Sequence, residues 1–176
     1  MDRVAAALQR DGLVCGDAIA LCGAPSVVQA LVFLGALRAG VVVAPLAPGS
    51  TPSSLARMVA DAQARRLFVD ASTAADFAAS TVPVTRLDGG FEAWLAPAGA
   101  VPSVVSLAPE SPFNIIYSSG TTGEPKGIVQ PHGMRWAHVR RGLPYGYGPG
   151  AVTLLATPLY SNTTLVVFFP SLAFGG

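Results

Sequence analysis

The chain has 176 residues, of which 51% are hydrophobic and 12% are charged, and its formal net charge is +1. Ordinary globular domains carry about 25% charged residues, so this sequence has more surface to bury than most. The near-neutral charge gives no electrostatic footprint for nucleic acid or acidic lipid. Two cysteines are too few for a disulfide framework or a zinc-binding pattern.

The apolar stretches are too short to cross a membrane, since a spanning helix needs roughly 18 or more such residues in a row. The stretch 27–37 meets Arg38 and Gly40, and the run 165–169 stops at Pro170. No signal peptide is evident at the amino terminus. We therefore expect a soluble, cytoplasmic protein with no membrane span.

The first half of the chain alternates between helix and strand patterns. Residues 1–10 predict a short amphipathic helix, and residues 17–23 predict a strand. The segment 26–40 predicts a helix that is apolar nearly all round, with Ser26 as its N-cap, Gln29 completing a capping box and Gly40 at its end. The β-branched run 41–46 predicts a strand covered on both faces.

The same alternation continues after residue 50. Thr51 and Pro52 predict the start of a helix, followed by a strand over 66–70, a weaker helix over 73–79 and a strand near 82–87. Residues 88–112 read as loop, apart from a turn of helix at 91–95, and residues 113–117 predict another strand. The pattern predicts an α/β fold with a mostly parallel sheet flanked by helices. Ligands in such folds bind beyond the carboxyl ends of the strands.

The segment SSGTTGEPKG, residues 118–127, lies directly beyond the predicted strand 113–117. Its glycines allow a ligand to approach the backbone, and its backbone N–H groups and hydroxyls can donate to an anion. Lys126 is the only lysine in the chain. This set of donors suits a polyphosphate, with a plain surface turn and a flexible linker as alternatives. The Walker A pattern does not fit, because Gly127 follows Lys126 where that pattern needs Ser or Thr.

The longer stretch YSSGTTGEPKGIVQPH resembles the signature loop of the AMP-forming adenylate enzymes. These enzymes include acyl-CoA synthetases, the adenylation domains of peptide synthetases, and luciferases. The region before the loop is similar to the amino-terminal region of that family, and TPLYSNTTLVVFF resembles its next motif, which helps to line the acyl pocket. The resemblance covers essentially the whole chain.

The resemblance implies a two-step reaction. A carboxylate attacks the α-phosphate of ATP to give an acyl-adenylate and pyrophosphate, and a thiol then accepts the acyl group. The implied cofactors are ATP, Mg²⁺ and coenzyme A, and the implied partners are a small carboxylic acid and the thiol of coenzyme A or of a carrier protein. The residues implied to bind phosphate are Ser118, Ser119, Gly120, Thr121, Thr122, Gly123 and Lys126.

The sequence departs from the family pattern after Tyr160, where relatives often have histidine and this chain has Ser161. Tyr160 and Asn162 are candidate acyl-pocket residues, and a helix-capping role near Asn162 is the alternative. We expect His132 and His138 each to have a structural or surface role. The arginines at 135, 140 and 141 predict a solvated helix face.

The resemblance implies that residues 1–176 form part of an amino-terminal AMP-binding domain. The later motifs and the small carboxyl-terminal domain with its catalytic lysine are absent, so no catalytic residue and no metal ligand is assigned here. The leading hypothesis is part of an AMP-forming acyl-CoA synthetase, a ligase that this part alone does not complete. The alternatives are a peptide-synthetase adenylation domain and a truncated, non-catalytic nucleotide-binding or interaction module.

Overall fold

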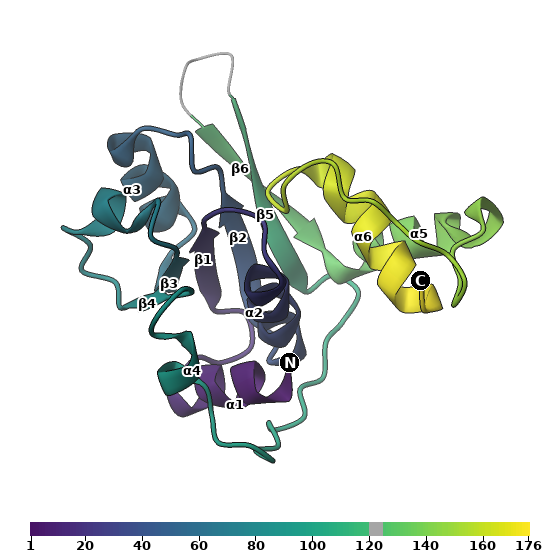
Figure 1. Ribbon diagram of the computed structural model, residues 1–176, viewed down its shortest axis with the longest axis horizontal. Helices are drawn as coiled ribbons and strands as arrows, with labels where there is room; N and C mark the ends of the chain where they lie inside the picture. The colour runs from purple at the N-terminus through teal and green to yellow at the C-terminus, as the bar shows by residue number, and fades with distance from the viewer. Residues whose placement is uncertain (120–124) are drawn as a thin grey trace.

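The computed structural model describes residues 1–119 and 125–176. Its centre is a six-stranded sheet with the strand order β4-β3-β1-β2-β5-β6 (Figure 1). All neighbouring strands are parallel except β5 and β6, which are antiparallel. The α/β fold with a mostly parallel sheet, predicted from the sequence, is confirmed.

The strands follow the predicted apolar runs closely, with one addition. They are β1 (Ala18–Cys22), β2 (Val42–Leu46), β3 (Ala64–Val69), β4 (Val84–Arg86), β5 (Pro112–Ser119) and β6 (Pro125–Pro131). Both β1 and β2 are buried along their whole length, as their continuous apolar composition predicts. The pattern did not predict β6, which is half-buried or exposed throughout.

The helices cover both faces of this sheet. They are α1 (Asp2–Arg10), α2 (Val27–Arg38), α3 (Pro52–Asp61), α4 (Phe91–Trp94), α5 (His132–Arg141) and α6 (Asn162–Phe174), with 3₁₀ turns η1 (Ala74–Phe77) and η2 (Leu143–Tyr145). Alternate residues of β1 face opposite cores. Ile19 and Leu21 pack with residues of α1, α2, α4 and α6, whereas Ala20 packs with residues of α3 and η1.

Two of the predicted helix starts are confirmed by side-chain contacts. The Ser26 hydroxyl accepts a hydrogen bond from the Gln29 N–H at 3.1 Å, and the Thr51 hydroxyl accepts one from the Ser54 N–H at 3.3 Å. The reciprocal half of the predicted capping box is wrong. The Gln29 side chain instead donates to the Gly23 carbonyl oxygen at 3.1 Å, which ties α2 to the loop after β1.

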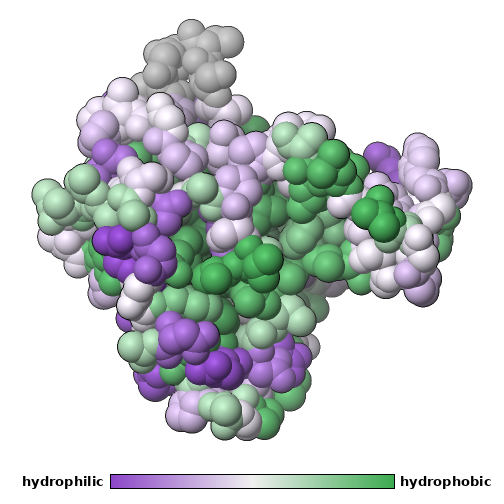
Figure 2. Space-filling view, viewed as in Figure 1, coloured by the Kyte–Doolittle hydropathy of each residue, from purple (hydrophilic) through white to green (hydrophobic). Residues whose placement is uncertain are grey.

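The helices α5 and α6 lie beside the sheet on the side of β5 and β6 (Figure 1). Figure 2 shows hydrophobic surface across the middle and right of this face, over α2 and α6, while hydrophilic residues gather towards α1. Val152 and Leu154, in the segment before α6, are 98% and 86% exposed. No helix among the described residues is long and apolar enough to span a membrane.

Candidate functional site

The antiparallel pair β5–β6 brings two of the predicted phosphate-binding residues together. Ser118 is registered opposite Lys126, and Ser119 is registered opposite Pro125. Directly opposed residues of an antiparallel pair project from the same face, so Ser118 and Lys126 are cross-strand neighbours. Both are exposed, and neither side chain has a hydrogen-bond or ion-pair partner among the described residues.

The prediction of a loop over the whole of 118–127 is wrong at both ends. Ser118 and Ser119 belong to β5, while Lys126 and Gly127 belong to β6. Pairing with a distant partner, rather than the local composition of either segment, extends these strands. The predicted residues Gly120, Thr121, Thr122 and Gly123 lie outside the described residues.

Below Ser118, the pair β5–β6 is fixed to the end of α3. The Tyr117 hydroxyl lies 2.9 Å from the Met58 carbonyl oxygen and 2.7 Å from the Asp61 Oδ2 atom. Burial, together with the neighbouring Asp61 carboxylate, raises the pKa of Tyr117, so its hydroxyl keeps its proton and remains a donor. This contact holds the strand that carries Ser118 against a helix.

Gly127 makes this close approach possible. A Cβ atom at residue 127 would lie 2.9 Å from Asp61 Oδ2 and 3.1 Å from both Ile115 Cγ2 and Tyr117 Cε1. A side chain at this position would push the Asp61 carboxylate away from its place beside Tyr117.

The two predicted acyl-pocket residues lie at the start of α6. Tyr160 is half-buried in the segment before this helix, and Asn162 is its first residue and is exposed. The buried Thr164 hydroxyl donates to the Thr157 carbonyl oxygen at 2.7 Å, which fixes the entry into α6. The capping role considered for Asn162 is wrong, because the N-cap is Ser161 and it makes no side-chain capping bond.

No hydrogen bond or ion pair joins Tyr160 or Asn162 to Ser118 or Lys126 within 1–119 and 125–176. The described residues therefore present two separate groups. One is the exposed donor pair on β5 and β6, and the other is the start of α6.

The prediction of a solvated arginine face on α5 holds for Arg140 and Arg141, which are both exposed, and is wrong for Arg135. Arg135 is 2% exposed, and its Nε atom donates to Asn114 Oδ1 at 3.1 Å. Its guanidinium also bonds Gln130 and lies 5.9 Å from the centre of the Phe113 ring. Burial lowers the pKa of Arg135 to about 10, which leaves it charged at neutral pH.

Sequence reasoning missed this buried polar group. The signal available was Asn114, a polar residue inside the apolar run FNIIY, which is fully buried in the structure. The Nδ2 atom of Asn114 and the Nη1 atom of Arg135 are buried without a partner among the described residues.

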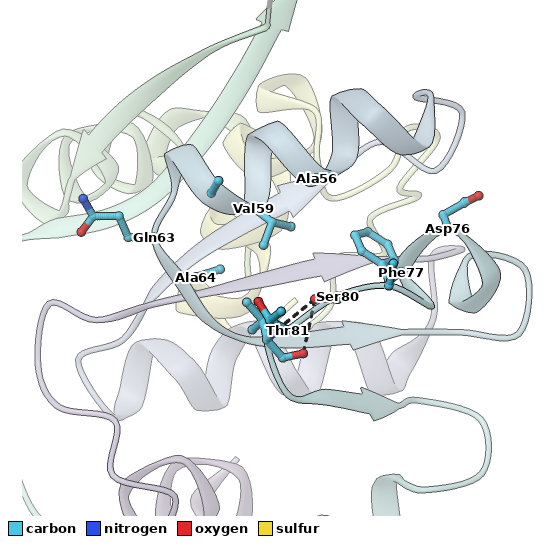
Figure 3. Close-up of a pocket in the computed structure, with 11 residues that line it drawn as sticks. Ala56, Val59, Gln63, Ala64, Asp76, Phe77, Ser80 and Thr81 are labelled. Carbon is cyan, nitrogen blue, oxygen red and sulfur yellow. Dashed lines mark hydrogen bonds between the residues drawn. The ribbon is translucent and has the colours of Figure 1, made fainter.

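A pocket of about 400 Å³ lies between α3, η1 and the segment 79–82 that precedes β4 (Figure 3). Its wall is built largely from small and apolar side chains, such as Ala56, Val59 and Phe77, with Gln63 and Thr81 among its polar members. None of the predicted site residues that the structure describes lines it. We therefore assign it no part in phosphate or acyl binding.

The described residues contain no group of three or more His, Cys, Asp or Glu that could hold a metal ion. The donors on β5 and β6 are the Ser118 hydroxyl and the Lys126 ammonium group, and both can bind an anion. Asp61, the carboxylate next to this pair, already bonds Tyr117.

Comparison with known sequences gives a consistent family match. A family model described as AMP-binding enzyme matches residues 1–176. The chain is 33% identical over 178 residues to the nonribosomal peptide synthetase-like enzyme fsqF of Aspergillus fumigatus, covering 98% of this chain and 12% of that protein. It is 29% identical over 176 residues to an L-proline–[L-prolyl-carrier protein] ligase of Pseudomonas fluorescens, covering 93% and 34%.

Comparison with solved structures matches the fold along nearly the whole chain. A long-chain-fatty-acid CoA ligase from Rhodopseudomonas palustris superimposes with a TM-score of 0.88 at 18% identity, covering 99% of this chain and 47% of that one. VinN in complex with 3-methylaspartate superimposes with a TM-score of 0.84 at 28% identity, covering 99% and 51%. The chain thus spans about half the length of these structures and a smaller share of the two sequence relatives.

Proposed function

We propose, because this chain belongs to the AMP-binding enzyme family, that it is the amino-terminal part of an adenylation domain of the peptide-synthetase type. Such a domain activates an amino acid or related carboxylic acid with ATP and passes it to a carrier-protein thiol. The observation that carries the proposal is the pair β5–β6, which presents Ser118 and Lys126 as exposed donors that bond no other described residue, beyond a buried parallel sheet.

The choice of this type over an acyl-CoA synthetase is supported by the named relatives. One is called a nonribosomal peptide synthetase-like enzyme and another a ligase that joins proline to a carrier protein. VinN was solved with 3-methylaspartate, an amino acid. The fatty-acid CoA ligase, at 18% identity, supports the fold alone. The acyl-CoA synthetase expected from the sequence is therefore the second candidate.

In the proposed reaction, the loop and its flanking strands hold the β- and γ-phosphates of ATP. The Ser118 and Ser119 hydroxyls and the loop residues Gly120, Thr121, Thr122 and Gly123 would supply donors. The Lys126 ammonium would offset the negative charge that develops as pyrophosphate leaves. Tyr117 would keep β5 in place, and Tyr160 and Asn162 would contact the acid. No step is assigned to Mg²⁺ or coenzyme A.

The test is ATP–pyrophosphate exchange by the full protein that contains this chain, across a panel of amino acids, fatty acids and aromatic acids. We expect exchange with one or a few amino acids, and transfer of the acyl group to a phosphopantetheinylated carrier protein in preference to free coenzyme A. Exchange with fatty or aromatic acids and transfer to coenzyme A would favour the acyl-CoA synthetase. No exchange with any acid would reject both candidates.

Lys126→Ala should lower the exchange rate by about 10²-fold or more, the usual effect of removing one transition-state charge contact. Arg140→Ala is the matched control, since Arg140 is also exposed and belongs to α5. An equal loss in both variants would show that general charge, and not the position of Lys126, matters.

A further inference from the structure

A second cavity, of about 460 Å³, lies where the end of α5, η2 and the first turns of α6 meet. Its wall combines basic, aromatic and branched apolar side chains, namely His138, Arg141, Tyr145, Tyr147, Val166 and Val167. The volume falls within the roughly 300–1,000 Å³ of small-molecule sites. None of the described residues assigned above to phosphate or acyl binding lines it.

The cavity depends on a close approach of the backbone at the end of α5. A Cβ atom at Gly142 would lie 2.7 Å from Pro170 Cβ and 3.1 Å from Tyr147 Cδ2. Only glycine therefore allows the end of α5, the segment after η2 and the middle of α6 to meet as they do. The position of Tyr147 in the cavity wall follows from this contact.

The charged side chain of the cavity wall is Arg141. Residues 125–176 include Lys126 and three arginines but no Asp or Glu. Arg141 is exposed and makes no ion pair with any described residue. The dipole of α5 places only about half a negative charge at its carboxyl end, where Arg140 and Arg141 both lie. The Arg141 guanidinium has no carboxylate partner among the described residues and is available to a ligand.

The other polar groups of the wall are neutral. The Nδ1 atom of His138 is buried without a partner among the described residues. Burial, and then the charges of Arg135 and Arg141, lower the pKa of His138, so its ring is uncharged at neutral pH. Neither tyrosine hydroxyl bonds a described residue.

We propose that this cavity binds a small carboxylic acid with an aromatic or branched apolar body, at a site separate from that of the reacting acid. The carboxylate would pair with the Arg141 guanidinium. The body would rest on Val166, Val167 and the tyrosine rings. One cation, neutral donors and an apolar wall together select a single negative charge attached to an apolar group.

The probe is benzoate, titrated calorimetrically without ATP into the full protein that contains this chain. Benzamide has nearly the same shape without the charge, and inorganic phosphate has the charge without the apolar body. We expect benzoate to bind at one saturable site, with both comparison molecules binding at least about tenfold more weakly. Absence of saturable benzoate binding, or equal binding of phosphate, would overturn the proposal.

Arg141→Gln should weaken benzoate binding by about tenfold, whereas Arg140→Gln, one residue away and outside the cavity wall, should leave it unchanged. Val167→Trp should fill the cavity and abolish binding without changing the charge. Circular dichroism and melting temperatures show whether each variant is folded. Equal affinity of the two arginine variants contradicts the proposal. So does loss of binding in Asn162→Leu without loss in Arg141→Gln, which would place benzoate at the start of α6.

Discussion

A single carboxylate, Asp70, holds together the loops that follow β1 and β3. Its Oδ2 atom accepts a hydrogen bond from the Ala24 N–H at 2.7 Å, and its Oδ1 atom accepts from the Ser72 N–H and hydroxyl and from Thr73. A Cβ atom at Gly23 would lie 2.8 Å from Oδ2. The positions of the two loops at the carboxyl ends of β1 and β3 thus depend on one side chain.

Asp70→Asn should lower the free energy of unfolding at pH 7 by about 1–3 kcal/mol, because an amide N–H would face one of these donors. Burial raises the pKa of Asp70, but hydrogen bonds from Ser72, Ala24 and Thr73 outweigh burial and leave the pKa lowered. The stabilisation is therefore present above the unfolded pKa of about 4 and is lost as pH falls through the lower folded value. Urea denaturation between pH 7 and 3 measures both effects.

The matched control is Asp76→Asn, since Asp76 lies in the same region and bonds no described residue through its side chain. Its stability should change by no more than about 0.5 kcal/mol. A difference between Asp70→Asn and the parent that persisted unchanged at pH 3 would contradict the assignment.

Arg135 carries a buried charge without a carboxylate beside it among the described residues. Arg135→Met should cost about 2–4 kcal/mol in unfolding free energy, because the Asn114 and Gln130 side-chain oxygens lose their donor. The double variant Asn114→Leu with Arg135→Met should lose less than the sum of the two single variants, since it removes donor and acceptor together. Additive losses would mean that the contact contributes nothing specific.

At the scale of elements, α1 contacts α2 at Gly35, a residue of α2 that has no side chain. A Cβ atom at Gly35 would lie 2.4 Å from Val4 Cβ and 3.0 Å from the Met1 carbonyl oxygen. Val4 is 2% exposed and belongs to the same core as α2. The separation of these helices is therefore set by the pair Gly35 and Val4.

Gly35→Ala should destabilise the chain by about 1–3 kcal/mol despite the better helix propensity of alanine, because the added methyl overlaps Val4. Gly49→Ala is the control, since a Cβ atom there meets nothing within 4 Å. Thermal denaturation of both variants compares them directly. Equal melting temperatures of Gly35→Ala and Gly49→Ala would show that α1 can move away from α2 at little cost in free energy.

The elements themselves were largely predictable, because α1 to α3 and β1 to β3 each carry a local apolar pattern, and α2 and α3 also begin at the N-cap residues Ser26 and Thr51. The strand β6 was not, since Ile128 and Val129 are both about half exposed and its strand conformation comes from pairing with β5. The burial of Arg135 follows from Asn114, 21 positions earlier, which local pattern cannot relate to it. For the same reason, local pattern placed Ser118 and Lys126 in one predicted loop, although they lie opposite each other on two paired strands.

At the scale of the whole molecule, the apolar surface is unevenly distributed. Val152 and Leu154 are almost fully exposed, and Trp136 and Leu143 are each about 60% exposed. Val152 lines one shallow pocket together with Leu155, Phe168 and Leu172, and exposed apolar side chains that lie together favour association. The residues before α6 are thus the part of this surface most available to another molecule.

The 176-residue chain should therefore self-associate at micromolar concentration and above. Val152→Lys with Leu154→Lys should shift the chain towards monomer without lowering its melting temperature, because neither side chain contributes to the core. Sedimentation velocity measures this shift. Val101→Lys with Val104→Lys, at two other exposed valines, controls for added charge alone. A monomeric parent would contradict the prediction.

The sheet also has one boundary at which few residues of neighbouring strands are paired. The strand β2 is registered with β5 at a single Cα pair, Val43 and Asn114, whereas β1 is registered with β2 over five. Proteins open locally in contiguous cooperative units, and we predict that β5, β6, α5 and α6 open as one unit and β1 to β4 as another. Amide protons of the first unit should exchange with deuterium sooner, and together. The residues proposed to bind phosphate would then belong to a unit that unfolds locally and cooperatively, while β1 to β4 remain folded.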